Sequence, residues 1–275
     1  MLFELFRRLR RRSAAASAVD LYLELLKNSV GNRIHDDDLD LMHGSFVRDA
    51  SGRLVSSQAV PVDAAQKRLG AIWPSRAHTM IGLPRLNNIR ACAETVLKEG
   101  IAGDFIETGV WRGGAVIFMR GILKAYGIRN RLVWVADSFQ GLPPADPEKY
   151  PKESPIDFHQ FADLAVSLEQ VRENFARYEL LDEQVRFLKG WFRDTLPKAP
   201  IEKLALMRLD GDLYESTMDA LVALYPKLSP GGFAIIDDYN LVQACNDAVD
   251  DFRRERGIAE PISLIEGGGS FWRKA

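Results

Sequence analysis

Acidic residues stand at or near the ends of four short apolar segments, and their side chains are the first candidates for chemistry. They are Glu107, Asp137, Asp210, Asp237 and Asp238. Carboxylates accept hydrogen bonds and protons and bind hard divalent cations. If the apolar segments are parallel strands of one open sheet, their carboxyl ends meet at a single edge, where ligands of such sheets bind. The pattern therefore predicts one acidic site shared by several strands.

The segment around Glu107 reads as a strand, a glycine turn and a helix. Its residues 103–114 are Gly-Asp-Phe-Ile-Glu-Thr-Gly-Val-Trp-Arg-Gly-Gly, followed by apolar residues at helical spacing. A dinucleotide-binding turn would have glycine two positions before Gly109, where this chain has Glu107, and a carboxylate there repels a pyrophosphate. S-adenosylmethionine has an ammonium group and a ribose diol but no phosphate, so it suits Glu107 better. The alternative is an ordinary turn with Glu107 facing solvent.

A second acidic residue, Asp137, ends the next apolar segment, within Trp-Val-Ala-Asp-Ser-Phe-Gln-Gly at 134–141. An acidic side chain at this place in a nucleotide-binding sheet can accept hydrogen bonds from both ribose hydroxyls. Ser138 and Phe139 follow and offer a hydroxyl and an aromatic face to an adenosine. Together with Glu107, Asp137 predicts a site for a nucleoside without phosphate.

The remaining three carboxylates suggest a metal. Three oxygen ligands from Asp210, Asp237 and Asp238 suit Mg²⁺, which keeps some positions for water or substrate. Zinc would require His or Cys ligands, and the sequence has no such cluster. The alternative is that these carboxylates are loop residues and helix caps. In particular, Asp212 is expected to be the N-cap of a helix over 215–228.

Other catalytic arrangements find little support. The chain has neither a Gly-x-Ser-x-Gly nucleophile elbow nor a Walker glycine–lysine loop. His78 either contacts an acceptor or packs internally, the commoner outcome for a lone histidine. Besides a reaction that uses S-adenosylmethionine, two other functions stay open at this stage. One is a nicotinamide-dependent oxidoreductase, and the other is a methyltransferase-like scaffold that binds without turnover.

The positions of these residues imply an α/β architecture. Strands are expected at 105–108, 132–137, 185–188, 204–209 and 233–237, with helices between them at 115–126, 164–178, 215–228 and 242–256. This alternation predicts a mainly parallel, doubly wound, Rossmann-like sheet. Two further short strands, 261–264 and 270–273, flank the Gly-Gly-Gly tract at 267–269 and are expected to form a closing hairpin.

The region before the sheet is predicted to be helical, with helices at 17–28, 64–69 and 85–99. Residues 31–62 are polar and are expected to be irregular, and the acidic run 36–38 to be a solvated loop. The proline-rich loop 143–155 is either a lid or a surface excursion. We divide the chain into an N-terminal region with lid elements, 1–100, and a catalytic domain, 101–275.

Composition narrows the class of protein. The 275 residues are 47% hydrophobic and 27% charged with a formal net charge of -2, which is typical of a soluble globular chain and argues against nucleic-acid binding. Two cysteines without metal spacing suit a reducing cytoplasm. No apolar run is long enough to span a bilayer. The arginine-rich residues 1–12 are either a weak interfacial membrane helix or, as we favour, a solvated terminus.

The motifs together resemble the macrocin O-methyltransferase family, also called TylF-like. The resemblance lies in residues 103–114, 133–141, 187–197, 208–216 and 229–239, and a further segment at 76–83 is similar. It extends over most of residues 21–273 and is weakest at the N-terminus, at 36–38 and at 266–271. These weak regions leave the acceptor open.

Family members are S-adenosylmethionine- and Mg²⁺-dependent sugar O-methyltransferases of macrolide and aminocoumarin pathways. The resemblance implies a seven-stranded sheet with an antiparallel last strand, a glycosylated acceptor and no nucleic-acid partner. We also expect a homo-oligomer. The predicted donor site comprises Glu107, Thr108, Gly109, Asp137, Ser138, Gly190 and Trp191. The predicted metal ligands are Asp210, Asp237 and Asp238, and Asp210 is the predicted proton acceptor.

Overall fold

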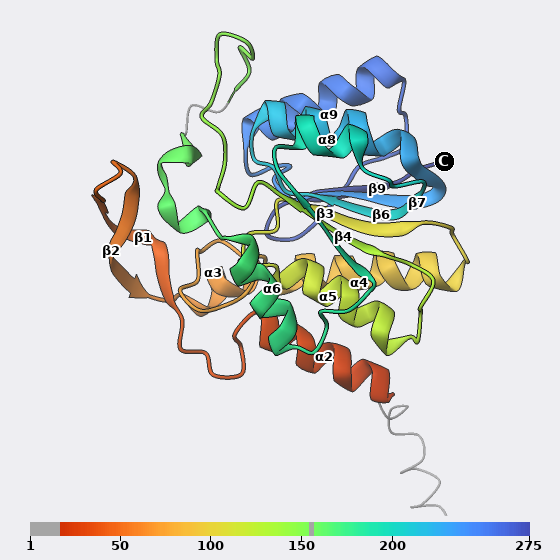
Figure 1. Ribbon diagram of the computed structural model, residues 1–275, viewed down its shortest axis with the longest axis horizontal. Coiled ribbons are helices and arrows are strands. Elements are labelled where there is room, and N and C mark those ends of the chain that lie inside the picture. Colours follow the sequence, from red (N-terminus) through yellow and green to blue (C-terminus); the bar gives the residue numbers. More distant parts are fainter. Residues whose placement is uncertain (1–16, 154–156) are drawn as a thin grey trace, which may run out of the picture.

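The computed structural model describes residues 17–153 and 157–275. Its centre is a seven-stranded sheet with the strand order β5-β4-β3-β6-β7-β9-β8 (Figure 1). The strands are β3 (Asp104–Thr108), β4 (Val133–Asp137), β5 (Val185–Lys189), β6 (Leu204–Leu209), β7 (Leu228–Ile236), β8 (Ser263–Leu264) and β9 (Ser270–Arg273). Strands β3 to β7 are parallel, and β9 pairs antiparallel with β7 and β8. The predicted doubly wound sheet with an antiparallel last strand is confirmed, as is the closing hairpin.

Helices cover both faces of this sheet. They are α2 (Ala18–Val30), α3 (Ala64–Leu69), α4 (Leu83–Lys98), α5 (Gly114–Ala125), α6 (Leu168–Arg177), α7 (Phe192–Thr195), α8 (Tyr214–Leu224) and α9 (Gln243–Arg256). In Figure 1, α8 and α9 lie on one face, and α4 and α5 lie on the other, with α2 beyond them. Short 3₁₀ turns cover residues 158–160, 162–164, 196–198 and 225–227.

Consecutive residues of a strand point into two separate hydrophobic cores, one on each face of the sheet. Phe105 points into the core shared with α2, α4 and α5, whereas its neighbour Ile106 points into the core shared with α8 and α9. Val133 and Trp134 on the next strand divide in the same way. Strands buried on both faces read as continuous apolar runs, which is why the sequence located them well.

Helix boundaries follow local capping rather than apolar periodicity. The predicted helix 164–178 begins instead at Leu168, because Ser167 is its N-cap and accepts a hydrogen bond from the Gln170 N–H. The predicted helix 215–228 ends at Leu224, where Pro226 falls in a 3₁₀ turn. The helices expected around 17–28, 85–99, 115–126 and 242–256 are present within two residues of their predicted limits.

The irregular loop predicted for residues 31–62 is wrong. Most of that segment is an antiparallel hairpin of β1 (Leu39–Arg48) and β2 (Leu54–Pro61), which lies outside the main sheet (Figure 1). The pair exposes much of both faces, so no buried apolar run marks it in the sequence. Its anchor is an edge-to-face cluster of Phe46, Trp73 and Phe161.

The acidic run before the hairpin is only partly solvated. Asp36 and Asp37 are exposed, as predicted, but Asp38 is buried. Its carboxylate lies 2.8 Å from Lys67 Nζ and accepts the Ala77 N–H at 3.0 Å. Asp38 therefore ties the hairpin to the segment that leads into α4.

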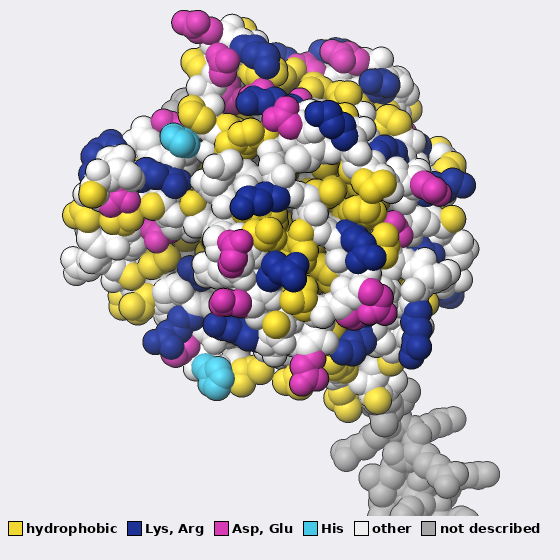
Figure 2. Space-filling model, viewed as in Figure 1, with side chains coloured by type: hydrophobic (Ala, Val, Ile, Leu, Met, Phe, Trp, Pro, Cys, Tyr) yellow, Lys and Arg dark blue, Asp and Glu magenta, His cyan; other side chains and the backbone are white. Residues whose placement is uncertain are grey.

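Two surface features agree with the composition. On the face drawn in Figure 2, Lys and Arg side chains are interspersed with Asp and Glu side chains. Within residues 17–153 and 157–275, no helix combines the length and apolar character needed to cross a bilayer. Residues 1–12, for which two interpretations stood open, lie outside the described residues.

Candidate active site

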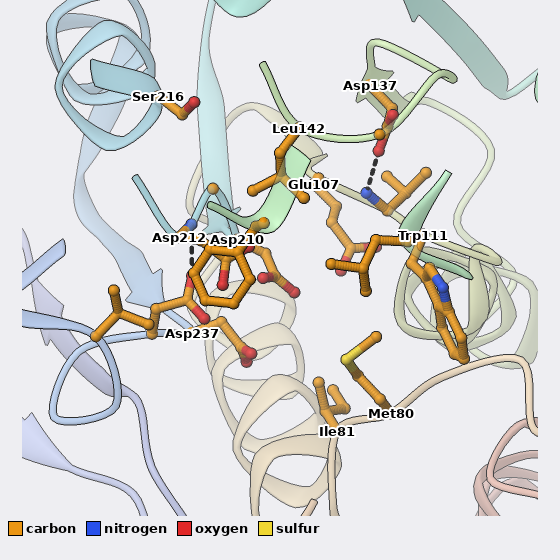
Figure 3. Close-up of a pocket in the computed structure, with 18 of the residues that line it drawn as sticks. Met80, Ile81, Glu107, Trp111, Asp137, Leu142, Asp210, Asp212, Ser216 and Asp237 are labelled. Carbon is orange, nitrogen blue, oxygen red and sulfur yellow. Dashed lines mark hydrogen bonds between the residues drawn. The ribbon is translucent and has the colours of Figure 1, made fainter. Parts of the chain in front are cut away.

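A cavity of about 650 Å³ lies at the carboxyl ends of the parallel strands. Most of the predicted site residues line it: Glu107, Gly109, Asp137, Ser138, Gly190, Trp191, Asp210, Asp237 and Asp238. Figure 3 shows Glu107, Trp111 and Asp137 on one side and Asp210, Asp212 and Asp237 on the other. Thr108 does not line the cavity; its carbonyl accepts the Asp210 N–H at 2.9 Å. The candidate donor and metal residues thus share one space.

Asp137 organises the turn after β3 from the neighbouring strand. Its Oδ2 accepts the Val110 N–H at 2.8 Å, and its Oδ1 accepts the Phe139 N–H at 2.6 Å. Burial raises the pKa of this carboxyl, and the backbone hydrogen bonds act in the opposite direction. Oδ1 also accepts from Ser138 Oγ at 3.4 Å, so Oδ2 is the oxygen better able to accept a ligand hydroxyl while Asp137 holds the turn.

Glu107 does not face solvent, so the alternative interpretation of its turn is wrong. The residue is 1% exposed, and Arg208 Nη1 donates to its Oε1. Its Oε2 has no hydrogen-bond partner in the described chain. Burial raises the pKa of Glu107 to about 8, an effect that Arg208 opposes and that Asp210 and Asp237 increase. A buried carboxylate oxygen without a partner, beside a cavity, fits a ligand that donates hydrogen bonds.

The three carboxylates of the predicted metal site converge. One oxygen each from Asp210, Asp237 and Asp238 lies within 4.8 Å of the others. Two arginines bind the same group: Arg208 Nη1 lies 3.0 Å from Asp210 Oδ2, and Arg85 Nη1 lies 2.5 Å from Asp237 Oδ2. Arg208 Nη2 also forms an ion pair with Asp237 Oδ1, without hydrogen-bond geometry.

Crowding of negative charge is the main electrostatic property of this end of the cavity. Burial and the neighbouring carboxylates raise the pKa of Asp210 to about 6 and raise that of Asp238 well above its usual range. A bound divalent cation would favour the ionised forms. The donor set consists of oxygen atoms alone, which fits Mg²⁺ better than zinc.

Asp212 is not the N-cap that the sequence predicted. Leu213 holds the N-cap position of α8 without a side-chain cap of its own, and the Glu153 carboxylate accepts the Tyr214 and Glu215 N–H groups instead. Asp212 has a left-handed backbone, with φ 55°, and its N–H donates to Asp238 Oδ2 at 3.0 Å. Its carboxylate lines the cavity, and within the described chain none of its oxygens has a hydrogen-bond or ion-pair partner. Burial raises its pKa to about 8.

Sequence reasoning missed several lining residues. The available signal for Arg208 was a single charged residue within the apolar run 204–209, and its place beside Glu107 on β3 came from the structure. Arg85 left no signal, since its partner is 152 residues away. Apolar walls come from Met80 and Ile81, within the segment 76–83, and from residues that no motif marks: Met42, Ile72, Leu142, Leu164, Leu241 and Val242.

His78 is packed internally, the commoner of its two predicted outcomes. Its Nδ1 lies 2.7 Å from Tyr178 Oη, and it does not line the cavity. Burial, together with Arg177 and Arg112, lowers its pKa to about 4. The neighbouring Thr79, Met80 and Ile81 line the cavity, and Figure 3 labels Met80 and Ile81.

Comparison with known proteins agrees with this geometry. Residues 19–274 match the macrocin-O-methyltransferase (TylF) family. The chain belongs to this family. It is 54% identical over 257 residues to the 8-demethyl-8-(2,3-dimethoxy-alpha-L-rhamnosyl)-tetracenomycin-C 4'-O-methyltransferase of Streptomyces olivaceus, covering 93% of each chain. It is 49% identical to the mycinamicin III 3''-O-methyltransferase of Micromonospora griseorubida, covering 94% of this chain and 98% of the relative.

Solved structures support the same family and fold. The O-methyltransferase NovP superposes with a TM-score of 0.83 at 46% identity, covering 94% of this chain and 99% of its own. The calicheamicin methyltransferase CalS11, at 22% identity and a TM-score of 0.55, shares the fold. Membership of the macrocin-O-methyltransferase family makes this chain an O-methyltransferase and implies S-adenosylmethionine as its methyl donor. The oxidoreductase alternative is therefore set aside.

Proposed function

We propose that this chain transfers methyl from S-adenosylmethionine to a sugar hydroxyl of a glycosylated natural product or glycan, with Mg²⁺ bound beside the acceptor. The observation that carries the proposal is the shared cavity. Carboxylates suited to a nucleoside and carboxylates suited to a divalent cation line the same space of about 650 Å³. Methyl transfer requires donor and acceptor in contact and in line, and a single cavity allows this.

The proposed donor half uses the turn after β3 and the ends of β4 and β5. Glu107 Oε2 is available to accept from a ligand ammonium or hydroxyl group. Asp137 and Ser138 border the space predicted for the ribose, and Gly190 and Trp191 close it beyond β5. In this proposal Thr108 acts through its backbone, which joins the turn to Asp210.

The acceptor class follows from the relatives. Two of them are named as methylating position 4' of a rhamnosyl tetracenomycin-C derivative and position 3'' of mycinamicin III. A third, from Streptomyces niveus, is a demethyldecarbamoylnovobiocin O-methyltransferase, 48% identical over 255 residues. The apolar walls beside the acidic end suit a large aglycone as well as a sugar. We therefore propose a glycoside as the acceptor.

The proposed metal ligands are Asp210, Asp237 and Asp238. When bound, Mg²⁺ makes an adjacent hydroxyl more acidic, and S-adenosylmethionine supplies an already activated methyl group. Three protein oxygens leave about three positions of an octahedral shell. The three carboxylates would hold the cation, and Arg85 and Arg208 form ion pairs with Asp237 and Asp210.

A vicinal diol would suit such a site, because its two neighbouring oxygens could bind the cation together and orient the ring. We propose such a diol as the preferred acceptor. By its name, the acceptor of the Streptomyces olivaceus relative carries methoxy groups at positions 2 and 3 and is methylated at 4'. In that acceptor the neighbouring oxygen at position 3 is an ether. The test therefore includes acceptors with a free neighbouring hydroxyl and acceptors in which that oxygen is methylated.

Two carboxylates are candidates to accept the hydroxyl proton. Asp210 is our predicted proton acceptor, but it already pairs with Arg208 and is a proposed ligand. Asp212 lines the same end of the cavity, and in the described chain its carboxylate has no partner. The variant Asp212→Asn distinguishes these two candidates. A large loss of kcat with unchanged Mg²⁺ affinity would identify Asp212 as the proton acceptor, and little change in kcat would identify Asp210.

Mass spectrometry of the purified protein with isotope-labelled donor, Mg²⁺ and a panel of glycosides tests the proposal. Labelled methyl should appear on a sugar oxygen, and the product should disappear with a chelator and return with Mg²⁺. No transfer to any glycoside would overturn the proposal that the acceptor is a glycoside. We also propose a cytoplasmic location, because the two free cysteines suit a reducing compartment. The homo-oligomeric state stays a prediction, which light scattering measures.

A further inference from the structure

The first strand of the hairpin contains a large β-bulge. Asp40 pairs with Val60 and Ser45 pairs with Gln58, so the four intervening residues of β1 lie opposite Ala59 alone. Bulges locally bend a strand and redirect its side chains, and they are frequent beside active sites. This bulge provides a short segment whose side chains do not follow the alternation of the hairpin.

The bulge presents two side chains to the cavity, Met42 and His43. Gly44, which follows them, packs directly on the opposite strand: a Cβ atom at this position would lie 2.1 Å from the Gln58 carbonyl oxygen. Only glycine allows such a close approach of two backbones. Glycine is therefore required at position 44 of this bulge, directly after His43.

His43 is oriented by a buried carboxylate. The side chain of Asp40 is 4% exposed, and its Oδ2 lies 2.6 Å from His43 Nδ1. Its Oδ1 accepts the Met42 N–H at 2.9 Å, and its backbone bridges to Pro74. Because both oxygens are engaged, Asp40 is anchored to the protein and holds one edge of the ring.

This contact determines whether the other ring nitrogen of His43, Nε2, donates or accepts a hydrogen bond. A carboxylate accepts hydrogen bonds, so the proton between the two groups lies on Nδ1. In the neutral imidazole Nε2 is then a hydrogen-bond acceptor. Within the described chain Nε2 has no partner, and half of the His43 side chain is exposed. The hairpin thus carries a preoriented acceptor beside an otherwise apolar wall that includes Met42 and Ile72.

We propose that His43 is a specificity-determining residue, which accepts a hydrogen bond from an acceptor hydroxyl that is not methylated, with Asp40 as its positioning residue. The inference rests on the proposed sugar O-methyltransfer. In that proposal the donor and Mg²⁺ occupy the strand ends, so the hairpin wall is left to the acceptor. A sugar has more hydroxyls than a metal can bind, and a site rejects analogues that lack a hydroxyl it pairs with.

Calorimetry and steady-state kinetics with a glycoside acceptor test this role. His43→Ala should raise the acceptor Kd, measured with S-adenosylhomocysteine and Mg²⁺ present, and the acceptor KM by about ten-fold, at nearly unchanged kcat. His43→Gln, whose amide oxygen still accepts, should recover part of the loss. His35→Ala is the matched control, because His35 is exposed and does not line the cavity.

Asp40→Asn tests the orientation without removing the ring. An amide N–H facing Nδ1 moves the ring proton to Nε2 and turns the acceptor into a donor, so this variant should resemble His43→Ala in acceptor KM. Thermal unfolding of each variant checks that the hairpin remains folded. The ¹⁵N resonance of His43 Nε2 should shift when acceptor is added to the wild type, a response that a purely structural histidine would not give.

Acceptor analogues that each lack one hydroxyl identify the hydroxyl that donates to His43. The wild type should discriminate about ten-fold against the analogue that lacks it, and His43→Ala should not discriminate. Equal KM and equal discrimination in wild type and His43→Ala would overturn the inference and leave methyl transfer standing. A fall in kcat alone would overturn it as well. If no glycoside binds or is methylated by the wild type, the proposed function fails and this inference fails with it.

Discussion

Gly109 and Asp210 are in direct backbone contact where the turn after β3 passes the loop after β6. A Cβ atom on Gly109 would lie 1.6 Å from the Asp210 carbonyl oxygen, and Gly109 has a left-handed φ of 77°. The Asp210 N–H also donates to the Thr108 carbonyl at 2.9 Å. The proposed donor turn and the proposed metal loop are therefore fixed to each other through the backbone.

The first prediction concerns this contact. Gly109→Ala should destabilise the fold and weaken donor binding, because it combines a left-handed φ, which costs roughly 1–2 kcal/mol for alanine, with a backbone clash. Gly127→Ala is the control: its φ is 66°, but nothing lies within 4 Å of the added Cβ. Thermal unfolding should therefore show a larger loss for Gly109→Ala. Equal losses would mean that the contact relaxes without cost.

The second prediction concerns the donor site. Asp137→Ala should weaken S-adenosylmethionine binding by roughly ten- to a hundred-fold, since charge-assisted hydrogen bonds contribute about 1.5–3 kcal/mol each. We expect some loss of stability too, because the Val110 and Phe139 N–H groups lose their acceptor. Isothermal calorimetry measures the affinity, with Asp194→Ala, an exposed residue, as control. Unaltered affinity would place the ribose elsewhere.

A third prediction addresses the metal. Asp238→Asn should weaken Mg²⁺ binding and much reduce the rate, because a buried ligand charge is lost. Glu255→Gln, on the exposed surface of α9, should change neither. Calorimetric titration with Mg²⁺ in the absence of donor gives a readout independent of turnover. Wild-type activity that survives a chelator would count against a metal at this site.

The fourth prediction concerns pH. The pKa of folded His78 is about 4, below its usual value of 6.5, so the unfolded state binds the proton more tightly. Its contribution to stability is complete above pH 6.5 and is lost as the pH falls toward 4. The decline of the melting temperature across this window should be shallower in His78→Gln than in the wild type. Identical slopes in His78→Gln and the wild type would refute the assignment.

The fifth prediction concerns the proline-rich loop, which we expect to act as a lid. The structure docks it on two helices: Lys152 Nζ lies 2.5 Å from Asp251 Oδ2, and Lys149 Nζ lies 3.3 Å from Glu215 Oε1. Trypsin should cut after Lys149 and Lys152 faster in Asp251→Asn than in the wild type. Adding donor product and acceptor should slow cutting in the wild type. Equal cutting with and without ligands would argue for a surface excursion.

The main sheet was predictable because its strands are buried on both faces. Phe105, Ile106, Val133 and Trp134 form continuous apolar runs, and parallel strands of this kind read clearly in a sequence. The hairpin was not predictable, since its side chains are mostly half-buried or exposed and the bulge at 41–44 breaks its alternation. Periodicity fails where neither face of a strand is a core face.

By itself, the sequence determined which carboxylates gather, because strand order and direction place Glu107, Asp137 and Asp210 at one edge whatever the side-chain details. Only the tertiary structure decided which charges accompany them and which groups face the cavity. Arg85 reaches Asp237 across 152 residues, and Asp212, which has the sequence of a helix cap, turns into the cavity instead. Local sequence encodes local geometry, whereas ion pairing and burial depend on segments that only folding brings together.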